Sequence, residues 1–412
     1  MNQKERKYYE WGIVILLALL LGSVMMNRLA IVYLFPFIIP EFKMSYAQAG
    51  ALTSILAIIS AFATWFLGGL SDRMGRKIIL LPATIFFSLM SWFSGLASSF
   101  LQIFFVRGLM GIGIGPIIPA SVATIAVEST PSRRGFNFGL HSSLPGLIAW
   151  GLGALLITQL TKIMSWRMVF FIVGIPGIIL SLVLYFYMRE PKSTVSHLSG
   201  GIEKSGFFAP LRYRNVIISC ITNILLMGCL FVFATFSVLY LTKEVYLSIS
   251  DAGIIMSLFG FAGFLGHILL PLLSDHVGRK PVLIPSVLVT GLGFLGFILS
   301  GSSLLLLAIS ISIAGFAFGG IAPISLSALT TESVPPHMAA MAVGIPFSIG
   351  EILGSALMPF LAGYLCDLYG LKIALFFPVL ACLITGFVGF FYKETAPKII
   401  SRRATVTPPV ST

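Results

Sequence analysis

The sequence contains little charge: only 10% of its 412 residues are Asp, Glu, Lys or Arg, whereas a soluble domain carries roughly a quarter. Hydrophobic residues make up 57% of the chain, and the mean hydropathy is +1.01. There is too little polar material to cover a surface that faces water. This shortage excludes a soluble globular domain and predicts that most of the chain lies in a lipid bilayer.

Cysteine is also scarce, and its four copies lie in apolar runs, at Cys220, Cys229, Cys366 and Cys382. Their positions have neither the spacing of a metal site nor that of a disulfide framework, so we expect them to pack in the interior. Outside its repeated motifs the sequence lacks a nucleophile–base constellation, metal-ligand spacing and a phosphate-binding loop. We therefore expect no enzyme activity and no cofactor or metal.

Acidic residues are the rarer charge, which leaves a formal net charge of +12. Such a charge can indicate nucleic-acid binding, but that function needs a basic stripe on a solvated face. Here the basic residues occur in small groups between apolar runs. We therefore expect the lipid bilayer as a partner and no nucleic acid.

Long apolar runs dominate what is present. A helix that spans a membrane needs about 20 mostly apolar residues. We count twelve such runs, at 11–36, 46–70, 78–98, 100–125, 136–160, 166–188, 214–241, 250–272, 282–301, 303–330, 339–364 and 370–392. The first run is too long for the apolar part of a cleavable signal peptide, so we expect it to remain as a helix.

The sequence repeats itself at an offset of about 203 residues. SYAQAG at 45–50 returns as SISDAG at 248–253, and SDRMGRK at 71–77 returns as SDHVGRK at 274–280. Two shorter matches follow: EST at 128–130 returns as ESV at 332–334, and REP at 189–191 is echoed by KET at 393–395. A duplicated, very apolar chain predicts two membrane bundles around a site at the middle of the membrane, as in many secondary transporters.

The connections between runs predict the orientation, because cytoplasmic loops carry an excess of Lys and Arg. With the N-terminus in the cytoplasm, the inner segments hold nineteen of these residues and the outer segments hold five. We therefore expect a plasma (inner) membrane protein with both termini in the cytoplasm. The expected divisions are an N-terminal six-helix bundle at 1–188, a cytoplasmic linker at 189–213, a C-terminal six-helix bundle at 214–392 and a cytoplasmic tail at 393–412.

A charged, glycine-containing motif connects the second and third runs and recurs in the second half. The residues expected to form this conformational gate are Gly68, Asp72, Arg73, Gly75 and Arg76, with Asp275, Gly278 and Arg279 in the second copy. A carboxylate there can bond a helix N-terminus or a cation and so stabilise one conformation. The motif resembles the signature of the major facilitator superfamily, which occurs at this loop in both halves.

The fourth run adds a second point of resemblance, because Arg107 is followed by a stripe of glycines ending at Gly115 and Pro116. The likeness extends from about residue 11 to about residue 394. It implies an all-α membrane protein with twelve transmembrane helices in two six-helix bundles, related by a pseudo-twofold axis. It also implies transport by alternating access, and we expect a monomer.

Within the superfamily, NRLA at 27–30 resembles the first helix of the anion:cation symporters, which take up sugar acids and related organic anions, usually with protons. Those proteins commonly carry an aspartate where this chain has Asn27, and often a glutamate where it has Ile114. The arginines are kept, but the acids that usually carry the proton are absent.

Ionisable residues inside a membrane are costly and often functional. We expect Arg28 and Arg107 to form an anion site as two cations without a carboxylate nearby on their own helices, with Arg107 binding a substrate carboxylate in a bidentate manner. The alternatives are that Arg107 bonds helix carbonyls and that Arg28 reaches the outer headgroups. Weaker candidates for substrate binding are Asn27, Tyr33 and Asn223.

Proton coupling requires a titratable group near the middle of the membrane. Glu351 is the acidic residue nearest the centre of a run, and it could bind a proton, pair with a cationic substrate or pair with a buried arginine. The alternative is a permanently protonated glutamate that bonds a neighbouring helix. His141 and His267 are further candidates, although an isolated membrane histidine is more often a packing residue.

Together these observations predict a secondary transporter that takes up a small organic anion with a proton, the anion being a sugar acid, an aromatic acid or another carboxylate. One alternative is an exporter of a hydrophobic or cationic compound. The Gly-Pro signature of drug exporters is inverted here, as Pro145-Gly146, which disfavours that reading. A remote alternative is a transporter-like sensor that binds a ligand without moving it.

Overall fold

The computed structural model describes residues 3–189 and 208–399. Every regular element in these ranges is helical, and twelve helices are long and apolar enough to cross a membrane. The prediction of an all-α chain with twelve spans is therefore confirmed. The first helix, Gln3–Phe42, is longer than the expected run and continues past Pro36 and Pro40, since packing against neighbouring helices can compensate for the lost backbone bonds.

The first half of the chain contains the first six spans. They are α1 (Gln3–Phe42), α2 (Tyr46–Met74), α3 (Arg76–Leu96), α4 (Phe100–Ile114) with α5 (Ile117–Glu128), α6 (Arg134–Pro145) with η1 (Gly146–Leu152) and α7 (Gly153–Leu160), and α8 (Trp166–Tyr187).

The second half contains the other six. They are α9 (Arg214–Lys243), α10 (Ile249–Val277), α11 (Arg279–Leu299), α12 (Leu304–Gly319) with η3 (Pro323–Ala328) and α13 (Leu329–Thr331), α14 (Ala339–Ile349) with η5 (Gly350–Leu357) and α15 (Met358–Tyr369), and α16 (Lys372–Gly389). Short 3₁₀ turns, η2 (Ala209–Arg212) and η4 (Pro336–Met338), precede α9 and α14.

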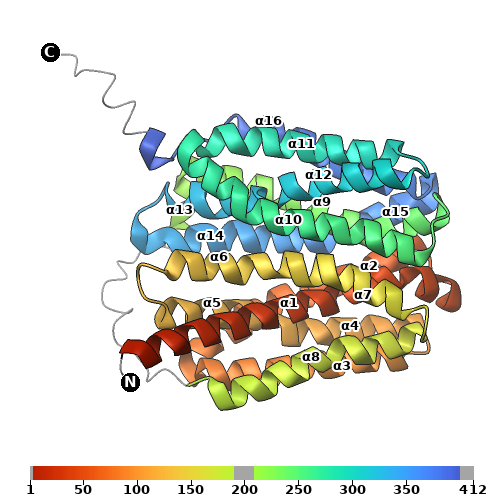
Figure 1. Cartoon of the computed structure of the whole chain (residues 1–412), viewed down its shortest axis with the longest axis horizontal. Helices are drawn as coiled ribbons and strands as arrows, with labels where there is room; N and C mark the ends of the chain where they lie inside the picture. The colour runs from red at the N-terminus through yellow and green to blue at the C-terminus, as the bar shows by residue number, and fades with distance from the viewer. Residues whose placement is uncertain (1–2, 190–207, 400–412) are drawn as a thin grey trace.

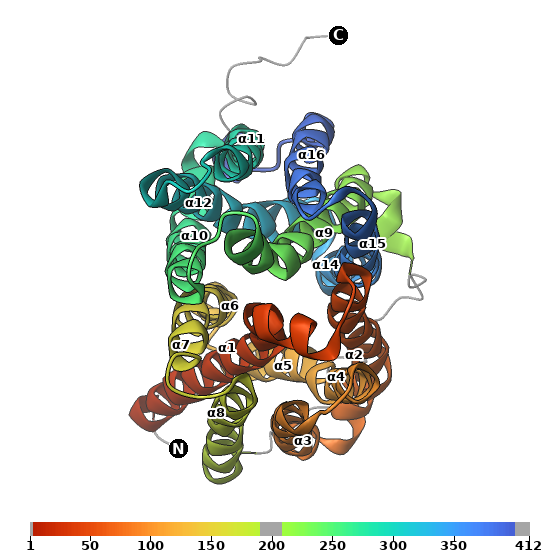
Figure 2. The same cartoon turned by 90° about the vertical axis from the view of Figure 1, so that its right-hand side faces the viewer.

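The two halves lie side by side, with the helices of both running along the long axis of the molecule (Figures 1 and 2). Helix α1 begins at one end of the bundle, which we call the inner end; the opposite end is the outer end. These names follow the orientation that the charge distribution predicts. Most of the expected linker, residues 190–207, and most of the expected tail, residues 400–412, fall outside the described residues, so the division at 189–213 stays a prediction.

Two pairs of helices carry much of the contact between the halves. On one side α2 packs against η5 and α15, and on the other α10 packs against η1 and α7 (Figure 2). The second contact is very close, because a Cβ added at Gly260 would lie 2.1 Å from the backbone N of Gly151. Five residues earlier in the same span the contact is looser, since a Cβ added at Gly146 would lie 3.6 Å from Phe264.

Three of the spans are interrupted by π-helical segments: η1 in the fifth span, η3 in the tenth and η5 in the eleventh. Such segments are rare and occur frequently at functional sites. The segment η5 contains Glu351, the carboxyl that the sequence analysis selected for proton coupling. The packing of η5 against α2 and α9 places this segment beside both halves.

Candidate functional site

The central feature is an ion pair that joins the two halves. Arg28 on α1 donates from Nη2 to Glu351 Oε2 at 3.0 Å and from Nη1 to Oε1 at 3.4 Å. The side chains are only 6% and 13% exposed. The expectation that Arg28 and Arg107 together form an anion site without a carboxylate does not describe Arg28 here, because it is paired with a carboxylate 323 residues away. The structure realises the alternative in which Glu351 pairs with a buried arginine. Arg28 therefore does not extend to the headgroups in this conformation.

Two further residues of the second half complete the surroundings of Arg28. The ring of Phe231 on α9 lies under the guanidinium, with Cζ 4.0 Å from the ring centroid. Ser355 Oγ accepts a bond from Arg28 Nη2 at 3.3 Å and lies 2.6 Å from Glu351 Oε2. The cation thus contacts a carboxylate, a hydroxyl and an aromatic face, all supplied by the opposite half. Sequence reasoning had not selected Phe231 or Ser355.

Arg107 has a different environment, inside the first half. Its Nη1 donates to the carbonyl of Asn27 at 3.1 Å, and its Nη2 donates to the carbonyl of Arg28 at 2.7 Å. The side chain is fully buried. The structure therefore realises the alternative in which Arg107 bonds helix carbonyls. The two carbonyls belong to Asn27 and Arg28, the candidate site residues on α1.

The other candidate substrate ligands also make internal bonds. Asn27 Nδ2 donates to the carbonyl of Val173 on α8 at 3.1 Å, Tyr33 donates to the carbonyl of Ala149 at 3.4 Å, and Asn223 Nδ2 donates to that of Pro346 at 2.8 Å. All three side chains are buried. The amide oxygen of Asn27 is buried and has no partner in the described residues, so it retains an unused acceptor.

The segments that carry the two histidines meet where α6 packs against α10. His267 Nε2 lies 3.0 Å from the hydroxyl of Ser142, the residue that follows His141 in the sequence. His141 is buried, and its Nε2 has no hydrogen-bond partner in the described residues. The two histidines fall in the fifth and eighth predicted runs, and the structure brings their segments together. Within the described ranges, neither histidine forms a hydrogen bond with Arg28 or Glu351.

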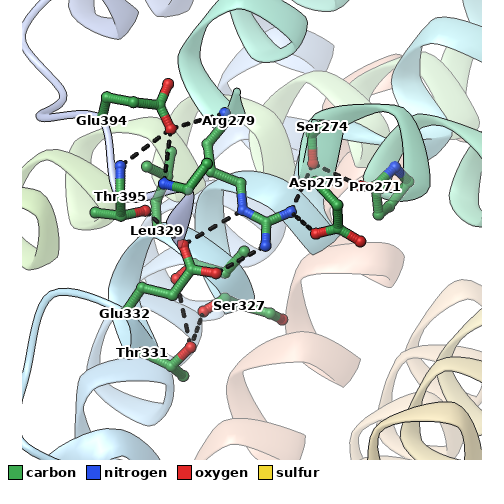
Figure 3. Close-up of polar contacts among 12 residues, drawn as sticks. Pro271, Ser274, Asp275, Arg279, Ser327, Leu329, Thr331, Glu332, Glu394 and Thr395 are labelled. Carbon is green, nitrogen blue, oxygen red and sulfur yellow. Dashed lines mark hydrogen bonds and ion pairs between the residues drawn. The ribbon is translucent and has the colours of Figure 1, made fainter. Parts of the chain in front are cut away.

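The second copy of the charged motif forms a network at the inner end of the second half (Figure 3). Arg279 pairs with Asp275 at 2.6 Å and with Glu332 at 2.7 Å, and it donates to Ser274 Oγ at 2.7 Å. Asp275 belongs to α10, Arg279 to α11, and Glu332 directly follows α13. All of these partners lie within one half, so the network stabilises the inner end of that half.

Glu394 completes this network by bonding the N-terminus of α11. Its carboxylate accepts the backbone N–H groups of Arg279 and Lys280, each at 2.9 Å. Partial burial would raise the pKa of Glu394, but these bonds and those from Ala396 and Thr395 outweigh it and hold the pKa below its ordinary value. Glu332 and Glu394 were not predicted site residues, although both lie in segments that repeat first-half motifs.

The first copy of the motif can be compared only in part, because Gly68 and the side chains of Asp72 and Arg73 lie outside the described part of the chain. The turn itself is shared: Gly75 has φ of 106° and Gly278 has φ of 119°, a region that favours glycine. In both halves the next helix begins at the following arginine, Arg76 or Arg279. The gating role of both copies stays a prediction.

The first half has a separate buried ion pair at its inner end, which sequence reasoning missed. Glu10 on α1 pairs with Arg133 at 2.7 Å and accepts a bond from Asn137 Nδ2 at 2.9 Å. Glu10 is 1% exposed. Within the described residues, no group of three or more His, Cys, Asp or Glu side chains could hold a metal ion.

The sequence of the chain matches a known family and several known transporters. A family model described as Major Facilitator Superfamily matches residues 17–345 and 220–411. A probable 4-methylmuconolactone transporter of Cupriavidus pinatubonensis is 26% identical over 338 residues, covering 78% of this chain and 77% of the relative. The hexuronate transporter of Bacillus subtilis is 28% identical over 277 residues, covering 65% of each chain.

Other relatives have a different named activity. The multidrug resistance protein MdtG of Salmonella arizonae is 29% identical over 247 residues, covering 59% of this chain and 60% of the relative. Among solved structures, a bacterial homologue of the human lysosomal transporter Spinster, in an inward-facing and occupied conformation, superposes with a TM-score of 0.77 at 19% identity, with full coverage of both chains. The nucleoside transporter NupG gives a TM-score of 0.71 at 19% identity, covering 95% of this chain and 98% of that one. At these identities the two structures support the fold alone.

Proposed function

The chain belongs to the major facilitator superfamily, and from that premise we propose that it takes up a small organic anion together with a proton. The family and the relatives are transporters and not enzymes. The observation that carries the proposal is the buried pair of Arg28 and Glu351 between the halves. The relatives named for 4-methylmuconolactone and hexuronate support a sugar acid, an aromatic acid or another carboxylate as substrate.

The proposed binding group is the guanidinium of Arg28. Its two terminal nitrogens form a planar fork that fits one carboxylate in bidentate geometry, and in this structure Glu351 occupies that fork. A substrate carboxylate that binds Arg28 in the same way must displace Glu351. Substrate and Glu351 therefore compete for one cation.

This competition supplies a route to proton coupling. When Glu351 is ionised, it occupies Arg28 and disfavours substrate binding. When Glu351 is protonated, its attraction to Arg28 falls, and the fork becomes available to the anion. Because the coupling between two ligands is reciprocal, bound substrate also favours protonation of Glu351. Joint binding of proton and anion is what symport requires.

The remaining candidate residues take supporting roles in this proposal. Arg107 positions the Asn27–Arg28 segment through its carbonyl bonds. Asn27 retains an unpaired amide oxygen beside this segment and stays a candidate substrate ligand, together with Tyr33 and Asn223. His141 and His267 are the next candidates for the proton, and the charged motif around Asp72 and Asp275 is the proposed conformational gate. We further propose a monomer in the inner membrane with cytoplasmic termini.

Export of a hydrophobic or cationic compound is the second candidate, and the multidrug resistance relatives favour it. In that mechanism Glu351 would be the counter-ion of the cargo. The ion pair disfavours this role, because a cationic compound would have to separate Glu351 from Arg28 and leave a buried guanidinium without its carboxylate. The direction of transport distinguishes the two candidates.

The test is uptake of radiolabelled sugar acids and aromatic carboxylates into proteoliposomes, with and without an imposed pH gradient. We expect at least one acid to accumulate when the outside is acidic. Glu351→Gln, which resembles the protonated acid, should retain substrate exchange but lose accumulation driven by the pH gradient. Glu244→Gln, which removes an exposed carboxylate at the outer end, is the matched control and should behave as the parent.

Two results would contradict the proposal. Concentrative uptake by Glu351→Gln would mean that the proton is carried elsewhere or that another ion drives transport. Loss of a preloaded hydrophobic cation from the vesicles, with no uptake of any acid, would favour the exporter.

A further inference from the structure

The outer end of α2 is stabilised partly by its own half of the protein. The first four N–H groups of an α-helix have no partner within the helix. At α2, Gln48 N–H donates to Ser45 Oγ at 3.2 Å, while Ser45 N–H donates to Gln48 Oε1 at 3.0 Å. This reciprocal arrangement is a capping box. It satisfies two of the four groups and leaves those of Tyr46 and Ala47.

The other two groups are satisfied by the opposite half. Asp367, near the outer end of α15, accepts the N–H of Tyr46 at Oδ1, at 2.8 Å, and the N–H of Ala47 at Oδ2, at 2.9 Å. Both carboxylate oxygens are therefore used on one helix terminus. The partial positive charge of that terminus favours a carboxylate. Together with the local capping box, Asp367 completes the cap of α2 from across the boundary between the halves.

The surrounding packing makes this contact part of a closed interface. A Cβ added at Gly363 would lie 2.3 Å from the carbonyl oxygen of Tyr46, and one added at Gly50 would lie 2.2 Å from that of Pro359. About two helical turns further in, Thr235 of the second half meets Thr53 of α2, with their hydroxyls 3.5 Å apart and both side chains buried. The backbones of the two halves are in direct contact along this part of α2.

The repeated segment in the second half is arranged differently. At the start of α10, Asp251 N–H donates to Ser248 Oγ at 3.1 Å, and Ser248 Oγ donates to Asp251 Oδ2 at 2.7 Å. This carboxylate bonds within its own turn and does not cross to the other half. The contact across the interface there is neutral: Gln159 Nε2 donates to Ser250 Oγ at 2.6 Å. The charged cross-half cap is therefore a feature of α2 that its repeat lacks.

From this asymmetry we propose that Asp367 is a positioning residue of the outer gate, which holds α2 against α15 whenever the transporter is closed to the outside. Asp367 is already exposed in this structure, so when the halves separate at their outer end the main change is that the N–H groups of Tyr46 and Ala47 lose the carboxylate and bond water instead. The capping box of Ser45 and Gln48 is local and keeps α2 helical in both states. Asp367 thus favours the closed outer gate without determining the fold of α2.

The experiment measures how often the outer gate opens, and it needs no substrate. A Thr53→Cys variant places a thiol inside the closed interface. Because Cys366 is buried beside Asp367 and could also be labelled when the gate opens, each Asp367 variant without Thr53→Cys gives the background labelling that is subtracted. The probe is a charged, membrane-impermeant maleimide added to right-side-out vesicles that contain the full chain. Removing the carboxylate with Asp367→Ala should accelerate labelling of the introduced thiol by about fivefold, as expected for the loss of a helix cap. Asp367→Asn should give a smaller increase, because its amide oxygen can still accept one bond.

The matched control is Asp251→Asn, which removes a carboxylate from the repeated segment without breaking a contact between the halves. It should leave the labelling rate unchanged, and inside-out vesicles should show no acceleration for any variant. Size-exclusion chromatography of each purified variant monitors folding, and Asp367→Asn serves as the test if Asp367→Ala does not fold. The proposal would be overturned if a folded Asp367 variant were labelled at the same rate as the protein with Asp367 intact. It would also be overturned if Asp251→Asn accelerated labelling as much as the Asp367 variants do.

Discussion

Arg28 and Arg107 are both buried in the membrane part of the chain, yet their surroundings differ in kind. Arg107 lies within the first half and donates to backbone carbonyls of α1. Arg28 lies between the halves and donates to a carboxylate and a hydroxyl of the second half. The two residues are linked, because one of the carbonyls that Arg107 bonds belongs to Arg28 itself.

The two arginines differ in the chemistry of the group that accepts their hydrogen bonds. A backbone carbonyl is neutral, cannot accept a proton near neutral pH and cannot move away from its helix. A carboxylate can be neutralised by a proton or displaced by another anion. Arg107 is therefore suited to a fixed structural bond, whereas Arg28 is suited to exchange of partners. Residue type alone did not distinguish these roles; the distinction depends on which half supplies the acceptor.

Removing Arg107 should have the largest effect. Arg107→Ala deletes two hydrogen bonds from a charged, fully buried donor, and we expect it to lower the free energy of unfolding in detergent by about 3–6 kcal/mol. Transport should be lost as a consequence. Arg107→Lys keeps the charge without the planar fork and should recover only part of the stability. As a control, Arg167→Ala breaks the more exposed pair with Glu41 and should cost less than about 1 kcal/mol. A small effect of Arg107→Ala would remove the contrast between the two arginines.

The ion pair should show an intermediate effect, measured by a double-mutant cycle. Arg28→Ala leaves Glu351 as a buried carboxylate without its cation, which is strongly unfavourable. The double variant Arg28→Ala/Glu351→Ala removes that charge, so we expect it to be more stable to unfolding than Arg28→Ala by about 1–3 kcal/mol. Strictly additive effects would mean that the two side chains do not interact in the membrane.

The smallest effect should come from the aromatic face under Arg28. Phe231→Leu removes the cation–π contact while keeping an apolar side chain, and it should weaken binding of the transported acid by about two- to tenfold. Phe233→Leu is the matched control on the same helix, because Phe233 contacts other phenylalanines. It should change thermal stability more than affinity. Equal losses of affinity in both variants would show that the ring under Arg28 has no specific role.

Much of the architecture could be predicted from the sequence, because each spanning helix is encoded locally by a long apolar run and the repeat relates one half to the other. The partners of the charged residues could not be predicted in the same way. Glu351 and Arg28 are separated by 323 positions, and Asp367 contacts Tyr46 across 321. No periodicity connects residues on different helices of different halves, so these contacts depend on how the bundles pack.

The case of Glu394 lies between these extremes. Its segment was visible as part of the repeat, but the sequence does not say that its carboxylate bonds the start of α11. That contact forms only if the chain after α16 turns back so that Glu394 reaches the N-terminus of α11. The repeated motif therefore indicates the segment that carries Glu394, whereas its bonding partner depends on how that segment packs against α11.

The π-helical segment that carries Glu351 has a consequence for chain length. A π-helix bonds residues five apart where an α-helix bonds residues four apart, so a short π segment acts as an extra residue inserted into an α-helix. The eleventh span thus contains one residue more than a regular helix between the same end points would need. A single-residue deletion in 350–357 that spares Glu351 and Ser355 is therefore a change that the flanking helices α14 and α15 can absorb without altering which faces they present. Deletions elsewhere in this span would instead rotate every residue beyond them by one position.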